Sequence, residues 1–221
     1  MLRLFLIAYL FAFTLCGSAS AAVVFYEDFG TTAPPSPGST LSINDYTGLS
    51  SGLDFEGTAV TADTPVSPSF LSSGYPTASG GSQAVIHLDF QQVGSLVVRG
   101  IDTTPFLPGT FELSFGYMLG LPGTLGPAPI EIFASTDDIE FLLVDTFQPL
   151  DQNGWQFYES AGLQIPLSTS LNIYLDVAVY NDNHLDDLRL SGASVPEPAG
   201  WLFLSCSFGS LAMNRRSRRR D

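Results

Sequence analysis

Two long segments of the chain alternate apolar and polar side chains with a period of two residues, and this pattern constrains the fold more than any other feature. In residues 110–119, every second position is apolar: Phe111, Leu113, Phe115, Tyr117 and Leu119. Residues 171–180 repeat the pattern with Leu171, Ile173, Leu175, Val177 and Val179. Because successive side chains of a β-strand point to opposite faces, each segment predicts a strand with one face buried in a core.

Shorter runs bounded by Gly, Pro, Ser or Asn predict further strands, at residues 23–29, 84–90, 95–99, 130–134, 141–147, 155–158 and 185–190. No amphipathic helix lies between them, so residues 22–195 are expected to form one all-β domain, an antiparallel β-sandwich of jelly-roll-like type. Residues 31–81 are dense in Pro, Ser, Thr and Gly and predict a loop-rich stretch. Loops that frame a binding face and merely loose connections both fit this composition.

The first 21 residues have the three parts of a secretory signal peptide. Arg3 gives a positively charged start, and residues 4–15 form an apolar run. Ala19 and Ala21 occupy the two small-residue positions of an A-x-A site, so cleavage is expected after Ala21. A retained membrane helix fits less well, because it needs about 20 apolar residues.

The tail, residues 196–221, combines a Pro-Glu-Pro motif, an apolar segment and a cluster of arginines. Pro196, Glu197 and Pro198 precede residues 199–213, which carry no charge. The chain then ends in an arginine cluster formed by Arg215, Arg216, Arg218, Arg219 and Arg220. A helix over residues 199–213 would be about 22 Å long and would serve as a short transmembrane anchor with arginines reaching to the headgroups. The arginines stop transfer, so the domain is expected outside the cytoplasm.

In these residues the tail resembles the sorting signal of the PEP-CTERM proteins. The resemblance implies that an exosortase-type membrane transpeptidase cuts the tail near Pro196, Glu197 and Pro198. It also implies an inner-membrane-anchored intermediate, after which the domain reaches the cell surface or the extracellular matrix. Hosts of this family typically make exopolysaccharide or biofilm, so association with exopolysaccharide is expected.

The domain between the two ends is strongly acidic. Of the 22 acidic residues only Glu197 and Asp221 lie outside residues 22–195, and Arg99 and Arg189 are its only Lys or Arg residues, which gives a net charge of −18. Such a charge repels the phosphate backbone and argues against nucleic acid as a partner. Both cysteines lie in the terminal apolar segments, so the domain has no disulfide and no thiolate site.

The strand rhythm from Glu131 onward, with an Asp-Asp pair in the last strand, resembles jelly-roll modules of the carbohydrate-binding and adhesion type. In several such families, acidic residues of the first and last strands meet at a structural calcium ion. The resemblance implies Glu27, Asp28, Asp186 and Asp187 as candidate calcium ligands, since calcium prefers several hard oxygens. The alternative is that one aspartate of each pair caps a turn and the other faces solvent.

No catalytic apparatus is recognisable in the sequence. Residues 48–52 spell G-x-S-x-G, but no helix is predicted after them, as a nucleophile elbow requires. We therefore expect a non-catalytic surface or matrix protein whose exposed aromatic side chains stack on sugars, with candidates Tyr46, Tyr75, Trp155, Tyr158 and Tyr180. Two alternatives remain open: a polysaccharide hydrolase, which predicts two close carboxylates in an aromatic-rich groove, and a purely structural matrix component without a discrete site.

Overall fold

A computed structural model describes residues 21–30, 40–63, 72–79, 83–86, 94–119, 127–177 and 183–195. Within these residues the chain is all-β, with twelve strands and one 3-10 turn, η1 (Ile43–Asp45). The described strands belong to one compact unit, Ser20–Ser194. The predicted signal peptide up to residue 20 and the sorting tail lie outside the described residues. No helix long and apolar enough to cross a membrane occurs in the described part of the chain.

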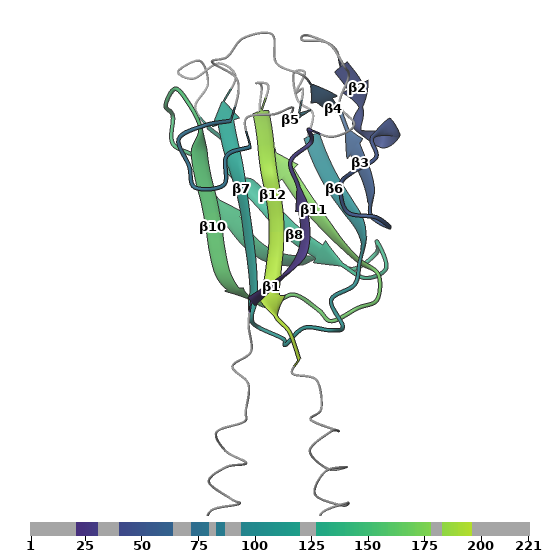
Figure 1. Cartoon of the computed structure of the whole chain (residues 1–221). Coiled ribbons are helices and arrows are strands. Elements are labelled where there is room, and N and C mark those ends of the chain that lie inside the picture. Colours follow the sequence, from purple (N-terminus) through teal and green to yellow (C-terminus); the bar gives the residue numbers. More distant parts are fainter. Residues whose placement is uncertain are drawn as a thin grey trace, which may run out of the picture. The chain divides into compact units, whose positions relative to one another are not determined.

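The strands form two antiparallel sheets that pack face to face (Figure 1). Sheet A contains β1 (Ala21–Glu27), β2 (Thr40–Ser42), β4 (Val60–Asp63), β5 (Gln83–Ile86), β7 (Phe111–Leu119), β10 (Gln156–Leu163) and β12 (Asn183–Ala193). Sheet B contains β3 (Asp54–Thr58), β6 (Gly94–Ile101), β8 (Ile130–Ser135), β9 (Leu142–Phe147) and β11 (Leu171–Val177). The strand order is β10-β7-β12-β5-β4-β2 in sheet A, with β1 also paired to β12, and β3-β6-β11-β8-β9 in sheet B.

The connections have the character of a jelly roll. From β5 onward the chain crosses to the other sheet after every strand except β8, which forms a hairpin with β9. The first and last strands pair antiparallel, with Ala21 opposite Ala193. The chain therefore enters and leaves the sandwich at the same end.

The predicted alternation is confirmed in the core. Phe111, Leu113, Phe115, Tyr117 and Leu119 of β7 are buried, and so are Leu171, Ile173, Leu175 and Val177 of β11. They contribute to one apolar core between the two sheets. Full burial of each such side chain stabilises the fold by about 1.5–3 kcal/mol relative to exposure. Val179 lies outside the described residues.

The loop-rich stretch, residues 31–81, differs from the sequence expectation, because it contains β2, β3, β4 and η1. It also supplies core aromatics: Tyr46 and Phe55 pack against Phe29 with ring centroids 5.6 and 6.1 Å away. The three strands have only three to five residues each and are separated by turn-forming residues. Alternation over so few residues is too short to be recognised in a sequence.

Candidate functional site

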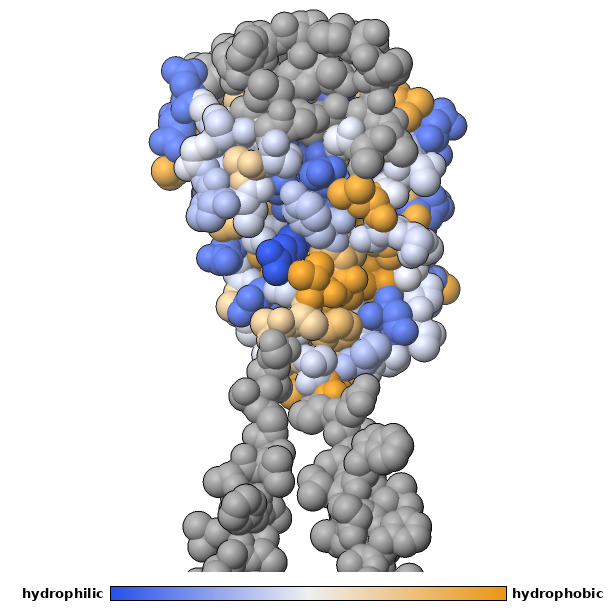
Figure 2. Space-filling model, viewed as in Figure 1, coloured by the Kyte–Doolittle hydropathy of each residue, from blue (hydrophilic) through white to orange (hydrophobic). Residues whose placement is uncertain are grey.

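The outer face of sheet A carries a shallow groove that we call the sheet A groove. The strand register places Ser114 of β7 between Glu159 of β10 and Arg189 of β12, and these three side chains point away from the core. The groove has a volume of about 280 Å³ and is lined by Ala21, Pro76, Thr77, Glu112, Ser114, Phe157, Glu159, Arg189 and Ser191. Strands β10, β7, β12 and β1 face the viewer in Figure 1, and in the same view Figure 2 shows hydrophilic groups beside an apolar patch.

Three aromatic rings form a wall beside this groove. Tyr75 stacks on Phe157 with a centroid distance of 5.4 Å and an interplanar angle of 14°. Trp155 packs against the same tyrosine at 6.0 Å in a tilted arrangement. All three side chains are half-buried, so each ring keeps part of its surface exposed. We call Tyr75, Trp155 and Phe157 the aromatic wall.

Gly116 allows the Tyr75 ring to approach β7 closely. An ideal Cβ atom at position 116 would lie 2.2 Å from the Tyr75 hydroxyl oxygen and 2.4 Å from Cζ, which no packing tolerates. Segment 72–79 therefore crosses the outer face of sheet A at a point where β7 has no side chain. Figure 1 shows this segment in front of β10 and β7.

The acidic pair of β12 fixes this segment in place. The Tyr75 hydroxyl and the Ser79 backbone N–H donate to Asp187 Oδ2, at 2.6 and 3.0 Å, and the Tyr26 hydroxyl donates to Oδ1 at 2.7 Å. The Ser79 hydroxyl donates to Asp186 Oδ2 at 3.3 Å. Burial and the hydrogen bond to Asp187 raise the pKa of Tyr75, so this phenol stays a donor.

A β-bulge in β12 orients the carboxylates of both Asp186 and Asp187 toward segment 72–79. The register between β12 and β7 shifts between Asp186 and Arg189, and Asp187 adopts a left-handed backbone conformation with φ of 53°. Aspartate tolerates this conformation better than most residues. The bulge breaks the two-residue alternation, so both members of the pair are buried.

Asp186 is expected to make the folded domain less stable at alkaline pH than at acidic pH. Burial, and next the charge of Asp187, raise the pKa of Asp186 to about 8. An aspartate in the unfolded chain titrates near pH 4, so between about pH 4 and pH 8 the folded protein holds a proton that the unfolded chain releases. The resulting stability is fully present below about pH 4, falls as the pH rises from there, and is gone above about pH 8.

We therefore expect Asp186→Asn to unfold at a higher temperature than the wild type at pH 9. The amide keeps an acceptor for the Asp187 N–H, which donates to Oδ1 at 2.8 Å, and has no charge to bury. The difference in unfolding free energy should be of the order of a few kcal/mol at pH 9 and small at pH 5. Thermal unfolding of both proteins from pH 5 to 9 measures it, and parallel curves would contradict the assignment.

Gly116→Ala is expected to displace Tyr75 from the sheet. The variant loses the charge-assisted hydrogen bond to Asp187 and the stacking on Phe157, so the free energy of unfolding should fall by about 2–4 kcal/mol. Denaturant unfolding measures this loss. In a Tyr75→Ala background the same glycine substitution should cost less than about 0.5 kcal/mol, because no ring is left to displace. Equal costs in the two backgrounds would contradict this role of Gly116.

The predicted calcium ligands do not form a common site in the structure. Glu27 is buried and accepts hydrogen bonds from the Tyr46 hydroxyl and two backbone N–H groups. Asp28 caps a turn by accepting from the Gly30 N–H at 2.9 Å. Asp186 and Asp187 hold segment 72–79. Among the described residues, no group of three or more His, Cys, Asp or Glu side chains is placed to hold a metal ion.

The aromatic residues suggested by the sequence take different positions. Tyr46 and Tyr158 are buried in the core, and Tyr180 lies outside the described residues. Tyr75 and Trp155 belong to the aromatic wall. Phe157 was not predicted as part of a site. Because it directly precedes the core residue Tyr158 in the same strand, its side chain points to the opposite, outer face of the sheet.

Several polar groups at the groove have no partner within the described residues. Arg189 forms no salt bridge there, whereas Arg99, the other arginine of the domain, is held by two carboxylates. Trp155 Nε1 and Thr77 Oγ1 are buried without a hydrogen-bond partner in the described structure. A buried polar group without a partner costs about 1–3 kcal/mol, so a ligand or a water that bonds to it is favoured.

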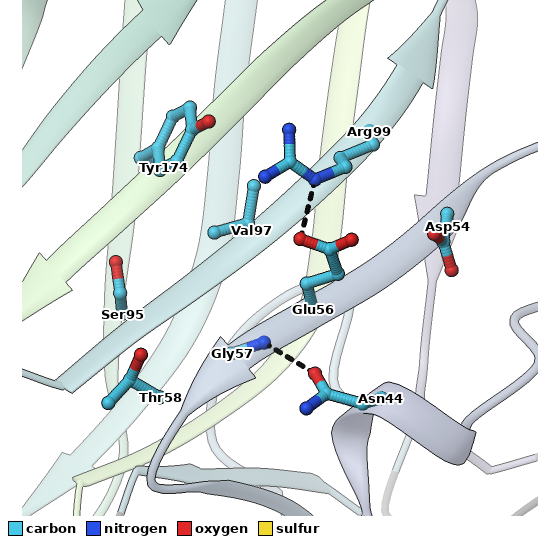
Figure 3. Close-up of a pocket in the computed structure, with 9 residues that line it drawn as sticks. All are labelled: Asn44, Asp54, Glu56, Gly57, Thr58, Ser95, Val97, Arg99 and Tyr174. Carbon is cyan, nitrogen blue, oxygen red and sulfur yellow. Dashed lines mark hydrogen bonds and ion pairs between the residues drawn. The ribbon is translucent and has the colours of Figure 1, made fainter. Parts of the chain in front are cut away.

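A second pocket lies on the outer face of sheet B, and we call it the sheet B pocket (Figure 3). It has a volume of about 460 Å³ and is lined by Asn44, Asp54, Glu56, Gly57, Thr58, Ser95, Val97, Arg99 and Tyr174. Arg99 Nε donates to Glu56 at 2.7 Å, and its guanidinium carbon lies 5.8 Å from the centre of the Tyr174 ring. The two hydrogen-bonded carboxylates raise the pKa of Arg99 despite the opposing effect of burial.

Comparisons with known proteins give similar folds but no family. No family model matches the chain, and no curated protein matches it. A family 22 xylan-binding domain of Xyn10C from Paenibacillus barcinonensis is 12% identical with a TM-score of 0.43, and the match covers 81% of this chain and all of that one. A family 29 carbohydrate-binding module from Piromyces equi is 11% identical with a TM-score of 0.41, over 79% of this chain and 92% of that one.

Two other structures are similar to the same degree. A family 61 carbohydrate-binding module in complex with β-1,4-galactotriose is 15% identical with a TM-score of 0.41, over 63% of this chain and 88% of that one. The enzymatically active domain of tailspike protein 4 of bacteriophage CBA120 is 14% identical with the same TM-score, over 63% of this chain and 19% of that one. Since all these TM-scores lie below 0.5, the likenesses carry no argument about ligand or activity.

Proposed function

We propose that the domain is a non-catalytic, exported module that binds polysaccharide in the sheet A groove. The aromatic wall beside Arg189 is the observation that carries the proposal. Pyranose rings present apolar C–H faces that pack on aromatic rings, while their hydroxyls need fixed donors and acceptors at the edge. The groove offers such groups in Arg189, Glu112 and Glu159.

The charge of the domain favours a neutral polymer. Residues 22–195 carry a net charge of −18, and the groove itself holds two glutamates against one arginine. A polymer of uronic acids would be repelled at long range and would gain only one arginine contact. A neutral sugar hydroxyl, in contrast, can accept from the guanidinium and donate to a carboxylate at once.

The two ends of the chain support delivery outside the cytoplasm as part of the proposal. The signal peptide directs export, and the PEP-CTERM tail anchors the chain until an exosortase-type enzyme processes it near Pro196, Glu197 and Pro198. Ala21 of β1 lies opposite Ala193 of β12, so the described domain begins and ends at the same end of the sandwich.

Retardation of the full-length chain in native gels containing polysaccharide tests the proposal. We expect retardation by at least one neutral polymer among β-glucan, galactan, xylan and mannan, with little dependence on salt. Alginate and hyaluronan serve as acidic comparisons. Binding to the acidic polymers alone, or to none of the six, would contradict the proposal.

The position of Glu112 and Glu159 gives one reason to test for hydrolysis. Glu159 is opposite Ser114 and Ala161 is opposite Glu112, so the two glutamates are diagonal neighbours roughly 7–8 Å apart, with their Cβ atoms somewhat closer. Glycosidases place two carboxylates at comparable separations, but they also keep one of them protonated in an apolar environment. Both glutamates are exposed, which favours binding without cleavage. Release of reducing ends that stops in both Glu112→Gln and Glu159→Gln would establish the hydrolase instead.

A further inference from the structure

The outer face of sheet B offers a second set of fixed polar groups. Arg99 is clamped between Glu56 and Asp138, with nitrogen–oxygen distances of 2.7 and 2.5 Å. Asn172 and Tyr174 also donate hydrogen bonds to Asp138, so this network extends across three strands and the β8–β9 turn. Side chains held in this way present donors and acceptors at fixed positions, which lowers the entropy lost when a ligand binds.

The sheet B pocket also has polar groups left over for a ligand. Asn44 uses its carbonyl oxygen to accept from the Gly57 N–H at 2.9 Å, so its amide nitrogen points away from that bond. Asp54 and Thr58 form no side-chain hydrogen bond within the described residues. Figure 3 shows these groups around the pocket, with Val97 between Tyr174 and the Arg99–Glu56 pair. A small apolar surface at Val97, surrounded by hydroxyl, amide and carboxylate groups, fits a sugar.

We propose that the sheet B pocket is a second site for neutral polysaccharide, so that one domain bridges two polymer chains. The inference rests on the proposed function, because bridging requires that the sheet A groove also bind polysaccharide. The inner faces of the two sheets pack against each other, so their outer faces point in opposite directions. Sheets in a sandwich lie about 10 Å apart, and a polymer lying along one face does not contact the other.

The acidic surroundings of the pocket select the same class of ligand. Asp54, Glu56 and Asp138 outnumber Arg99, whose charge is already compensated by two of them. Among the described residues that line the pocket, no cationic group is left to pair with a uronate or a phosphate. The pocket therefore binds hydroxyl-rich neutral sugars.

Bridging is tested with the full chain and two labelled forms of one polymer. The neutral polymer that retards the wild type most is linked to beads, and a fluorescent form of it is added in solution with the protein. We expect the wild type to capture fluorescence on the beads. Thr58→Trp fills the sheet B pocket from an exposed position without removing a described hydrogen bond, and Thr146→Trp places the same ring on exposed β9 outside it as a control.

The Thr58→Trp and Phe157→Ala variants should each bind the polymer and lose at least about 80% of the captured fluorescence, whereas the double variant should not bind. Thr146→Trp should bridge like the wild type. A dimer could bridge two polymer chains through its two sheet A grooves alone. Sedimentation of the wild type without polymer therefore shows whether the protein is monomeric. Bridging by Thr58→Trp, or complete loss of binding in Phe157→Ala, would overturn the second site while leaving the proposed function intact. Failure of the wild type to bind any polymer would overturn both.

Discussion

Replacing Glu27 with alanine is expected to lower the free energy of unfolding by about 3–5 kcal/mol, because two buried donors and one partly buried donor lose their acceptor together. Glu27 accepts from the Tyr46 hydroxyl at 2.5 Å and from the N–H groups of Phe29 and Leu49 at 2.9 and 2.7 Å. These bonds tie the end of β1 to the turn that follows it and to residues 46–49. Denaturant unfolding of the full chain measures the loss.

Two matched variants show whether hydrogen bonding is the cause. Glu27→Gln keeps the oxygen that accepts from Phe29 and Tyr46 and loses only the acceptor for Leu49, so it should cost about 1–2 kcal/mol. Asp28→Ala removes a single exposed turn bond and should cost less than about 1 kcal/mol. If Glu27 and Asp28 were instead joint calcium ligands, EDTA would destabilise the wild type, and both alanine variants would already lack that stabilisation. That result would contradict the structural role assigned here to Glu27.

Truncation of the aromatic wall is expected to weaken polysaccharide binding by about 10–100-fold for Trp155→Ala and for Phe157→Ala, equivalent to about 1.4–2.7 kcal/mol each. Each substitution removes a ring surface on which a sugar packs, and Phe157→Ala also widens the groove, because Phe157 lines it. Affinity in polysaccharide gels, measured over a range of polymer concentrations, gives the change.

The control for this pair is Leu150→Ala, which removes an exposed apolar side chain that lines neither pocket. This variant should bind within about twofold of the wild type. All three variants should keep the wild-type unfolding midpoint within a few degrees. Folded Trp155→Ala and Phe157→Ala proteins that bind as well as the wild type would show that the aromatic wall is not the site.

The long strands were predictable from the sequence because a two-residue alternation is strong over many residues. In strands β7 and β11 every described position that was predicted to face the core is buried. The opposite face is also covered at Gly116, Met118 and Asn172. Strands β2, β3 and β4 were not predicted, because each is held by tertiary packing around Tyr46 and Phe55 rather than by a pattern of its own.

The candidate site was only partly predictable, because its parts come together through long-range contacts. Tyr75 and Trp155 were among the aromatic candidates, but their association with Phe157 depends on the path of segment 72–79. The absence of a side chain at Gly116 decides that path, and so do hydrogen bonds to Asp187 across more than 100 residues of sequence. A glycine in the middle of a strand was the one local signal of a close approach.

The acidic pairs show how one residue pattern supports two interpretations. The Glu27–Asp28 and Asp186–Asp187 pairs suggested a calcium site because oxygen ligands from first and last strands commonly meet. In the structure each carboxylate accepts hydrogen bonds from backbone N–H groups or hydroxyls nearby. For Asp28, the alternative of a turn-capping aspartate agrees with the structure. The burial of Asp186 and Asp187 depends on a β-bulge that the sequence does not mark.

The tryptophan fluorescence of the full chain carrying Trp201→Phe tests the central claim most directly. Trp155 is then the only tryptophan, since the chain has two, and it lies in the aromatic wall. We expect titration with a neutral polysaccharide that the protein binds to change the Trp155 emission until the change saturates. The midpoint should equal that of gel retardation, and the Phe157→Ala variant should not show the response. Binding that leaves Trp155 emission unchanged, or no binding of any neutral polymer, would contradict the assignment of the sheet A groove as a polysaccharide site.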